Sequence, residues 1–299
     1  MKLGDLLSPD RILVPIGGEN LREAISEIVT AMQAAGTVDD PTRFEELVGD
    51  TLPADVVTVR QAFLLYFRTD AVPHLTVALG IAPNPLHREH DPTKQARIVL
   101  LVTAPPHETS RFLRTVSAFS RALGQEEVVD KLLASEKPED VLAIESIAGI
   151  ELRDYLEVRD VMVHRRLYVS PDTKLKEAAR LMATASVPSL PVLSDTGEVL
   201  GMVGQKELLR HLLPVYVKRI TGEESPEGNG DASDEPDPNE LPVRDVMDRS
   251  VLCISEDQTI GEIATMMLSR NMDRFPVVRD GRLVGFLTRG DMVRRLFGR

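Results

Sequence analysis

The sequence has a single cysteine, Cys253, and no apolar run close to the length of a membrane span. One cysteine cannot form a disulfide within the chain, which indicates a reducing compartment. A helix that crosses a bilayer needs about 20 apolar residues, and the N-terminus also lacks the apolar core of a signal peptide. We therefore expect a cytoplasmic protein with no membrane span.

The chain is also poor in positive charge. Its 299 residues carry a formal net charge of −12, which argues against a nucleic-acid-binding surface. The acidic excess is uneven, because 221–240 holds eight acidic side chains and no basic one, whereas the rest of 151–299 is mildly basic. This basic remainder could accept an anion. The length predicts about two domains.

The second half of the chain contains a repeated segment. Asp160–Met162 recurs as Asp245–Met247, and Leu190–Leu193 recurs as Phe275–Val278. The offset is 85 residues up to a hairpin turn and 84 residues after it. A constant offset that changes by one at a turn is typical of a duplicated folding unit. Each copy predicts the order β-α-β-β-α, in which a helix with apolar residues at helical spacing precedes a two-stranded hairpin.

This element order, with its Pro-Val strand and the ending Gly285–Asp291, resembles a pair of CBS domains over about 152–215 and 240–299. We expect 151–220 to form the first repeat and 241–299 to form the second. The resemblance implies clefts between the repeats that bind an adenosine nucleotide. AMP, ADP and ATP are the candidates, and S-adenosylmethionine is also considered. A homodimer formed through the CBS domains is expected.

Four residues of the second repeat are candidates for the nucleotide site. The carboxylate of Asp291 has enough lone pairs to accept both hydroxyls of a ribose. Thr288, three residues earlier at a helix start, can meet phosphate where backbone donors also point. Arg274 matches a position whose basic side chain often reaches phosphate in the CBS family, and Arg289 is a second candidate. The same Thr-x-x-Asp spacing is also a helix-capping pattern that needs no ligand.

The first repeat departs from this pattern. Glu207 keeps the acid, but Gly204 stands where the second repeat has its threonine. We therefore expect one good nucleotide site, not two.

The segment between the repeats, 221–240, is rich in Gly, Ser, Pro and acids and has no large apolar residue. This composition predicts a disordered linker. A passive tether is the simpler interpretation, and competition of its acidic charge for the basic cleft is the alternative.

The first half of the chain predicts an α/β domain with a mixed sheet over 1–150. Asn20 is placed to cap an amphipathic helix that Gly36 ends. The pattern of Asp55–Leu65 fits either a helix or a strand. Strands are also predicted at 11–14, 75–79 and 98–102, and helices at 41–48, 108–123 and 126–133.

Three stretches of this half carry a second resemblance: Leu7–Leu13, Ala71–His74 and Val77–Leu86. Through them, residues 1–145 resemble the enzyme IIA domain of the mannitol/fructose or nitrogen-regulatory type from the bacterial sugar phosphotransferase system. In that family the histidine that ends an Ala-x-Pro-His-like motif accepts a phosphoryl group, and His74 holds this position. A neutral imidazole suits the role, because one nitrogen is nucleophilic while the other keeps its proton. The resemblance implies phosphotransferase carrier proteins as partners.

The phosphate-binding turn of that family is missing from the sequence. Phe67–Asp70 contains no glycine where the family has a glycine-rich turn, and the carboxylate of Asp70 would repel a phosphoryl group. Phe112 aligns with the family's second histidine, while His107 lies nearby but off register. Phosphoryl transfer depends on positioning and charge stabilisation, so these departures argue against it.

The histidines allow two further interpretations. Instead of being phosphorylated, His74 could be half-buried and held by a neighbouring carbonyl; if it were phosphorylated, Arg60 or Arg68 would supply positive charge. His87 and His90 have a spacing seen in metal sites, but their Pro-flanked loop offers no clear further ligands or second shell. A solvated loop is expected there, and no metal.

The sequence as a whole predicts a regulatory protein more readily than an enzyme. In this hypothesis the CBS pair binds an adenosine nucleotide and alters how the IIA-like domain or a dimer interface presents itself. The alternative is a phosphocarrier that accepts a phosphoryl group on His74, which would make the chain a phosphotransferase. A third possibility is a structural pair of domains that dimerises with both clefts empty.

Overall fold

The computed structural model describes residues 1–51, 56–88, 91–164, 167–211 and 240–297. The chain separates into two compact units, Met1–Val161 with Val293–Arg299, and Met162–Met292. Within the described part of the chain, no helix has the length and apolar character needed to cross a membrane. The domain limits given above stay predictions. Residues 221–239 of the predicted linker lie outside the described residues.

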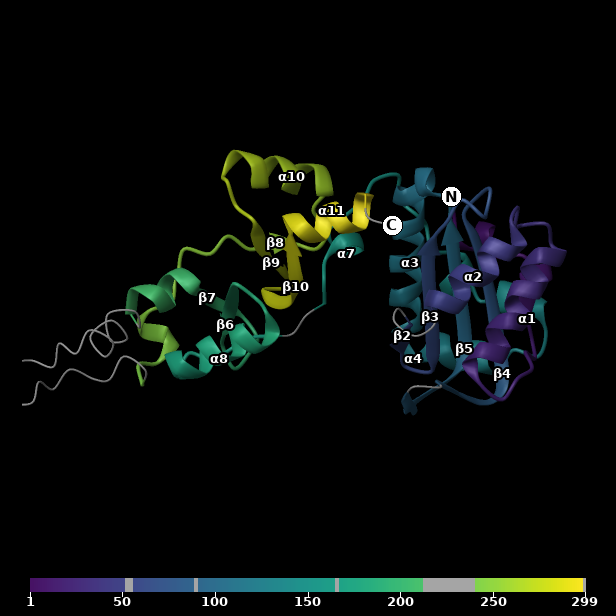
Figure 1. Ribbon diagram of the computed structural model, residues 1–299, viewed down its shortest axis with the longest axis horizontal. Coiled ribbons are helices and arrows are strands. Elements are labelled where there is room, and N and C mark those ends of the chain that lie inside the picture. Colours follow the sequence, from purple (N-terminus) through teal and green to yellow (C-terminus); the bar gives the residue numbers. More distant parts are fainter. Residues whose placement is uncertain (52–55, 89–90, 165–166, 212–239, 298–299) are drawn as a thin grey trace, which may run out of the picture. The chain divides into compact units, whose positions relative to one another are not determined.

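The first unit contains a five-stranded mixed sheet with the order β1-β4-β5-β3-β2 (Figure 1). The β1–β4 and β3–β5 pairs are parallel, whereas β4–β5 and β2–β3 are antiparallel. The strands are β1 (Ile12–Leu13), β2 (Val57–Val59), β3 (Ala62–Arg68), β4 (Thr76–Arg88) and β5 (Asp91–Ala104). The α-helices are α1 (Leu21–Ala34), α2 (Pro41–Thr51), α3 (Thr109–Leu123), α4 (Glu126–Leu133), α5 (Pro138–Leu142), α6 (Glu145–Ala148) and α7 (Val158–Val161). Short 3₁₀ turns are η1 (Leu3–Leu6), η2 (Pro9–Arg11) and η3 (Pro106–Glu108).

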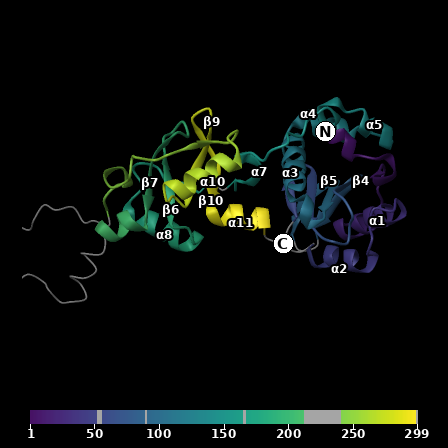
Figure 2. The ribbon, with the colours of Figure 1, turned by 90° about the horizontal axis from the view of Figure 1, so that it is seen from above.

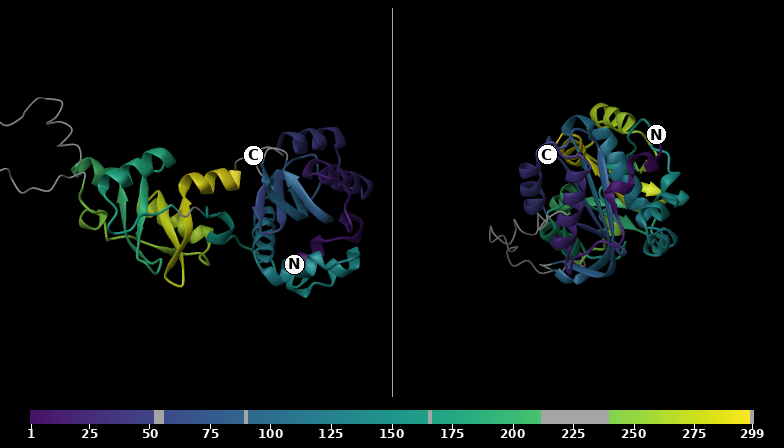
Figure 3. Two further views of the ribbon diagram at one scale, coloured as in Figure 1. Left: turned by 90° about the horizontal axis from the view of Figure 1, so that it is seen from below. Right: turned by 90° about the vertical axis from the view of Figure 1, so that its right-hand side faces the viewer.

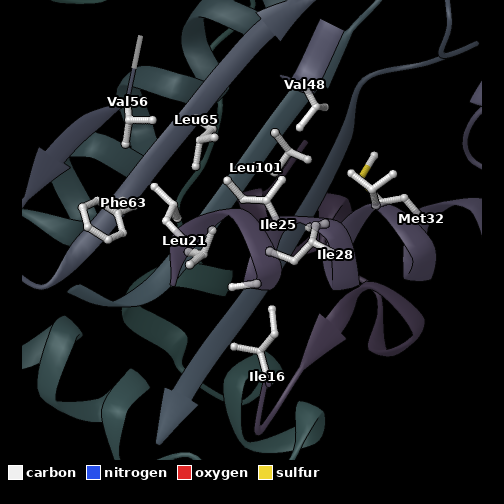
Figure 4. Close-up of a cluster of buried hydrophobic side chains, with 14 of the residues drawn as sticks. Ile16, Leu21, Ile25, Ile28, Met32, Val48, Val56, Phe63, Leu65 and Leu101 are labelled. Atoms are coloured by element: carbon white, nitrogen blue, oxygen red, sulfur yellow. The ribbon is translucent and has the colours of Figure 1, made fainter. Parts of the chain in front are cut away.

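Helices cover both faces of this sheet (Figures 1 and 2). On one face, Ile25 of α1 packs in a buried cluster with Leu65 of β3 and Leu101 of β5 (Figure 4). Successive side chains of a strand point to opposite faces, and the next residue, Tyr66, accordingly contacts Phe112 of α3 at 6.2 Å between ring centroids. The domain is therefore a three-layer α/β/α structure, and the predicted α/β class with a mixed sheet is confirmed.

Local signals in the sequence explain several element boundaries. The side chain of Asn20 accepts a hydrogen bond from Glu23 N at 3.0 Å, so it caps α1 as predicted. Gly36, just past the end of α1, has a φ of 67°, a left-handed conformation that glycine adopts at no steric cost. Within the ambiguous stretch Asp55–Leu65, residues 57–59 and 62–65 form strand: β2 and the start of β3 pair as an antiparallel hairpin.

The second unit contains the two repeats, whose hairpins lie side by side (Figures 1 and 3). The first repeat has α8 (Leu175–Ala185), β6 (Ser189–Leu193) and β7 (Val199–Gly204), followed by helical residues 205–211. The second repeat has η4 (Val243–Asp245), β8 (Ile254–Ser255), α10 (Ile260–Ser269), β9 (Arg274–Arg279), β10 (Arg282–Thr288) and α11 (Arg289–Phe297). The first strand of the predicted β-α-β-β-α order is reduced in this repeat to one bridge, which joins Val169 to Val192.

The two repeats exchange their leading segments. In the first exchange, Val163 N donates to Phe286 O at 2.8 Å and Phe286 N donates to Val163 O at 3.0 Å. In the second, Asp248 and Met202 form the corresponding pair of bonds, each at 2.8 Å. The sequence offset relates Val163 to Asp248 and Met202 to Phe286, so the two exchanges are equivalent. The segment before each repeat thus pairs with the hairpin of the other repeat.

Two glycines make these crossings possible. A Cβ added to Gly285 would lie 2.7 Å from Val163 O, and a Cβ added to Gly201 would lie 2.7 Å from Asp248 O. Both of these oxygens belong to the backbone, so they cannot rotate away as a side chain could. Gly201 and Gly285 are also related by the sequence offset, so each repeat needs glycine at the same point for the same steric reason.

We predict that Gly285→Ala and Gly201→Ala each lower the free energy of unfolding by about 1–3 kcal/mol, because the new methyl group forces the paired backbones apart. Equilibrium urea unfolding of the full chain measures this loss. Gly261→Ala in α10 is the control, since nothing lies within 4 Å of its added Cβ. Unchanged urea midpoints for both crossing variants would contradict the steric explanation.

Candidate functional site

A cleft of about 580 Å³ opens between the two repeats. One wall comes from the start of β6, and the other comes from the loop before β9 together with the end of β10 and the start of α11. Its lining residues are Pro188, Ser189, Met272, Asp273, Arg274, Thr288, Arg289 and Gly290. Three of the predicted site residues, Arg274, Thr288 and Arg289, are therefore brought together at the open end of the hairpin, where Arg274 of β9 pairs with Thr288 of β10.

Arg274 bridges the repeats across this cleft. Its Nη1 donates to Ser189 O at 3.1 Å and to Ser189 Oγ at 3.4 Å. Its guanidinium also lies over the ring of Phe286, 5.4 Å from the centroid, which is cation–π geometry. Ser189 occupies the position of Arg274 in the first repeat, so equivalent residues of the two copies meet here.

Thr288 and Asp291 cap α11 reciprocally. Asp291 N donates to Thr288 Oγ1 at 3.0 Å, and Thr288 N donates to Asp291 Oδ2 at 3.2 Å. The threonine hydroxyl also donates to Asp291 Oδ2 at 2.6 Å. The capping interpretation of this motif is thus realised in the structure. Thr288 lines the cleft, whereas Asp291 is half-buried one residue beyond the lining residue Gly290.

The guanidinium of Arg289 holds the C-terminal end of α10. Nη2 donates to Met267 O at 2.9 Å and to Asn271 Oδ1 at 3.3 Å, and Nε donates to Met272 O at 3.2 Å. Nη1 lies 3.0 Å from Asp273 Oδ1 in an ion pair. Met267 O also accepts from Met272 N at 3.1 Å, so the guanidinium adds to a backbone bond that already closes the end of α10.

The first repeat keeps only the acidic half of the cap. Gly204 N donates to Glu207 Oε2 at 3.0 Å, which reproduces the bond from Thr288 N to Asp291. Gly204 has no hydroxyl to offer. Glu207 does not line the cleft described above.

The backbone of the first unit brings His74 next to Glu108. β3 and β5 are parallel and β4 is antiparallel to β5, so the end of β3, the start of β4 and the end of β5 share one edge of the sheet. His74 precedes β4, and Glu108 follows β5. His74 Nδ1 lies 3.4 Å from Glu108 Oε1. The imidazole is 81% exposed, so the half-buried histidine held by a carbonyl is wrong: a carboxylate is its neighbour.

Glu108 is itself largely buried and gathers donors. Arg111 Nη1 lies 2.6 Å from Glu108 Oε2, and Leu75 N donates to Glu108 Oε1 at 3.4 Å. The carboxylate therefore lies at Nδ1 of His74, where it can accept the proton of that nitrogen and orient the imidazole. The sequence had not identified Glu108, although its place after β5 is visible once the strand order is known.

The other predicted groups around His74 are engaged elsewhere. Asp70 pairs with Arg43 of α2 at 2.8 Å, which offsets its charge. Arg68 Nη1 donates to Thr109 Oγ1 at 2.6 Å, and burial lowers its pKa. Arg60 precedes β3, at the far end of that strand from His74, and its Nε donates to Gly124 O at 2.7 Å. Phe112 is buried against Tyr66 and forms part of the core.

His107 lies in η3, next to Glu108. His87 is exposed on β4, and His90 lies outside the described residues. Among the residues that the structure describes, no group of three His, Cys, Asp or Glu side chains could hold a metal ion.

A second acidic residue that the sequence did not single out is Asp160, on α7. Its carboxylate lies 3.6 Å from Arg121 Nη1 of α3, and Oδ2 accepts from Glu157 N at 3.0 Å. Burial raises the pKa of Asp160, while Ser117 and Arg121 act in the opposite direction. Asp245, the equivalent residue in the second repeat, is exposed. Aligning the sequences of the two repeats shows that Asp160 and Asp245 are equivalent, but it does not reveal that only Asp160 is buried.

Family models match both halves of the chain. Residues 5–146 match the family described as phosphoenolpyruvate-dependent sugar phosphotransferase system, EIIA 2. Residues 158–214 and 243–298 each match the CBS domain. The chain thus consists of an N-terminal domain of the EIIA 2 family followed by a tandem pair of CBS domains.

Individual relatives match about half of the chain. An uncharacterised protein of Methanocaldococcus jannaschii is 26% identical over 152 residues, which are 46% of this chain and 90% of that protein. The inosine-5'-monophosphate dehydrogenase of the same organism is 26% identical over 153 residues, 51% of this chain but only 25% of the enzyme. A crystal structure of CBSX2 in complex with AMP has 28% identity and a TM-score of 0.36, and covers 46% of this chain and 93% of that one.

We predict that His74 is a poor phosphoryl acceptor, because Phe67–Asp70 contains no glycine turn that would supply backbone donors to the phosphoryl oxygens. Incubation of the full chain with phosphoenolpyruvate and the general phosphotransferase components should leave little acid-labile label, compared with an authentic EIIA domain as positive control. Stoichiometric label that His74→Ala removes, and that His87→Ala leaves in place, would overturn this prediction.

Proposed function

We propose that the CBS pair binds an adenosine nucleotide in the cleft between the repeats, and that binding modulates the EIIA-like domain. The observation that carries the proposal is the convergence of Arg274 and Thr288 on one cleft at the start of α11. A cleft of about 580 Å³ falls within the usual range for small-molecule sites. The resemblance to the CBS family supplies the adenosine class of ligand.

The chemistry of the cleft suits a phosphorylated nucleoside. Arg274 offers a cation that reaches Ser189 across the cleft, and a phosphate oxygen can take the place of the serine oxygens as its acceptor. Thr288 stands at the first turn of a helix, where backbone N–H groups and the helix dipole favour an anion. Gly290, next to Arg289, leaves open space, since the nearest atom to its added Cβ is Thr288 Oγ1 at 3.7 Å.

The ribose is assigned to Asp291. Its Oδ2 accepts from the threonine hydroxyl and from Thr288 N, and a carboxylate has further lone pairs for a ribose diol. In this assignment the carboxylate of Asp291 both caps α11 and accepts the ribose hydroxyls of the nucleotide. The first repeat, with Gly204 and Glu207, has no hydroxyl, so we propose a single high-affinity site.

The proposed link to the EIIA-like domain rests on Asp160. The chain that leads into the first CBS repeat is held on α3 by the buried carboxylate of Asp160, which contacts Arg121. Glu157 beside it is also buried, and pairs with Arg159 at 2.8 Å and with Arg153. Helix α3 begins directly after Glu108, the neighbour of His74. A nucleotide that shifts the leading segment of the repeats would therefore act on the helix that borders the histidine.

The partners that complete this proposal are a second copy of the chain, through the CBS domains, and carrier proteins of the phosphotransferase system. In the competing hypothesis the chain is a phosphocarrier on His74. The absence of glycine from Phe67–Asp70 and the burial of Phe112 favour the regulatory function over that hypothesis.

Calorimetric titration of AMP, ADP, ATP and S-adenosylmethionine into the full chain tests nucleotide binding. We predict that Asp291→Ala weakens adenosine nucleotide binding by about ten- to a hundredfold, the loss of a charge-assisted hydrogen bond. Its unliganded form should also lose about 1 kcal/mol of stability, because the helix cap is removed. Glu207→Ala is the matched control, since it removes the equivalent cap and should leave the affinity almost unchanged. No binding at millimolar nucleotide, or a larger loss in Glu207→Ala, contradicts the proposed site.

The Asp160 contact is tested through its pH dependence. Burial raises the pKa of Asp160 in the folded protein. The protonated carboxyl group therefore contributes its full stability below the ordinary aspartate pKa near 4, and this contribution is lost as the pH rises through the raised pKa. Asp160→Asn cannot ionise, so its stability relative to wild type should increase from pH 4 to pH 7. Hydrogen exchange of the amides of Glu157 and Asp160 measures the local stability.

Asp245→Asn, at the exposed equivalent position, should show no such trend. In the wild-type chain, saturating AMP should change the exchange rate of the Asp160 amide. Hydrogen exchange of the Asp160 amide that is identical with and without bound AMP would contradict the regulatory link but not nucleotide binding.

A further inference from the structure

We infer that the cleft selects a nucleoside monophosphate over di- and triphosphates and over the sulfonium nucleoside S-adenosylmethionine, with Asp273 as the residue that sets this preference. The inference rests on the nucleotide binding proposed above. It follows from the charges that the described part of the chain places around the cleft.

The charges around the cleft are nearly balanced. Among the residues that the structure describes, the ionisable side chains that line the cleft are Asp273, Arg274 and Arg289. Asp291 follows the lining residue Gly290 and adds a second carboxylate at the edge. These side chains carry a net charge of about +1 without Asp291 and about 0 with it. A monophosphate carries about two negative charges at neutral pH and ATP about four, so ATP leaves more charge unbalanced in the cleft.

Arg289 is unsuited to follow a longer phosphate chain. Its three nitrogens are directed to Met267 O, Met272 O, Asn271 Oδ1 and the carboxylate of Asp273. Turning toward a phosphate would leave the last carbonyls of α10 without these donors, which carries its own cost. Arg289 therefore acts as a structural residue of the cleft wall, and the phosphate-binding role falls to Arg274.

Asp273 contributes repulsion where a second or third phosphate would extend. Its side chain lines the cleft next to Arg274, is 79% exposed, and holds Arg289 in place. Like charges across a binding site suppress the wrong ligand. The size of the cleft does not discriminate between the nucleotides, because about 580 Å³ is large enough for several ligand sizes. S-adenosylmethionine is disfavoured for a different reason: it has no phosphate for Arg274 and Thr288, and its sulfonium and ammonium groups give it a net positive charge.

The test compares AMP, ADP, ATP and S-adenosylmethionine by calorimetric titration into the full wild-type chain, without divalent cations and at fixed ionic strength. AMP should bind at least about tenfold more tightly than ATP, the difference that several like charges produce at a partly exposed site. Adding Mg²⁺, which neutralises part of the triphosphate, should narrow the gap between AMP and ATP.

Asp273→Asn should improve ATP binding by about two- to fivefold with little change for AMP, the magnitude expected of one exposed charge. Asp280→Asn is the matched control. It removes the same charge from an exposed turn with a φ of 49°, which asparagine tolerates, and it should change neither affinity. Equal unfolding temperatures of the two variants establish that both are folded.

ATP binding as tight as AMP binding in wild type, or an equal gain for both nucleotides in Asp273→Asn, would overturn the selectivity while leaving nucleotide binding in place. If none of the four ligands binds at millimolar concentration, the proposed function fails, and the selectivity fails with it.

Discussion

The second half of this protein depends on the close crossing of two pairs of backbone segments. At Gly285 and at Gly201, the chain that leads into one repeat passes within hydrogen-bonding distance of the hairpin of the other repeat. Neither repeat is complete without this exchange: Val243, from the segment before the second repeat, is buried in the apolar cluster of the first repeat. The cleft exists because the exchange holds Ser189 and Arg274 face to face. A change at the crossing therefore acts on folding and on the site together.

In the N-terminal domain, the sheet order decides which side chains can meet. The parallel β3–β5 pair and the antiparallel β4–β5 pair bring three strand ends to one edge, where His74 and Glu108 face each other. This geometry belongs to the fold and would be the same whichever residues stood there. The chemistry depends on the side chains, and here Glu108 lies beside His74 and also accepts from Arg111 and from Leu75 N. The strand order thus places these groups together, while their identity decides what they can do.

Features carried by local patterns could be predicted from the sequence, and features that depend on packing could not. The Asn20 cap, the repeat and the hairpins follow from nearby residues, so they were accessible. The stretch Asp55–Leu65 was ambiguous because its strand character depends on pairing between β2 and β3. The clamp of Arg289 on α10 was not predicted, since nothing in the sequence tells whether an arginine next to a phosphate motif turns toward ligand or toward a helix end. For the same reason, the sequence left open whether Thr288 and Asp291 cap α11 or bind a ligand.

Equivalent positions of the two repeats have different surroundings. Comparing them distinguishes positions that the fold requires from positions that border the cleft or contact α3. Gly201 and Gly285 remain identical because both crossings need the same space. Ser189 and Arg274 differ, as do Gly204 and Thr288, and each of these pairs borders or corresponds to the cleft. Asp160 and Asp245 have kept the same side chain, yet one is buried against α3 and the other is exposed. Positions that preserve the fold have therefore stayed the same in both copies. The contact with α3 is made by the first copy alone, whereas both copies line the cleft and the second supplies Arg274 and Thr288.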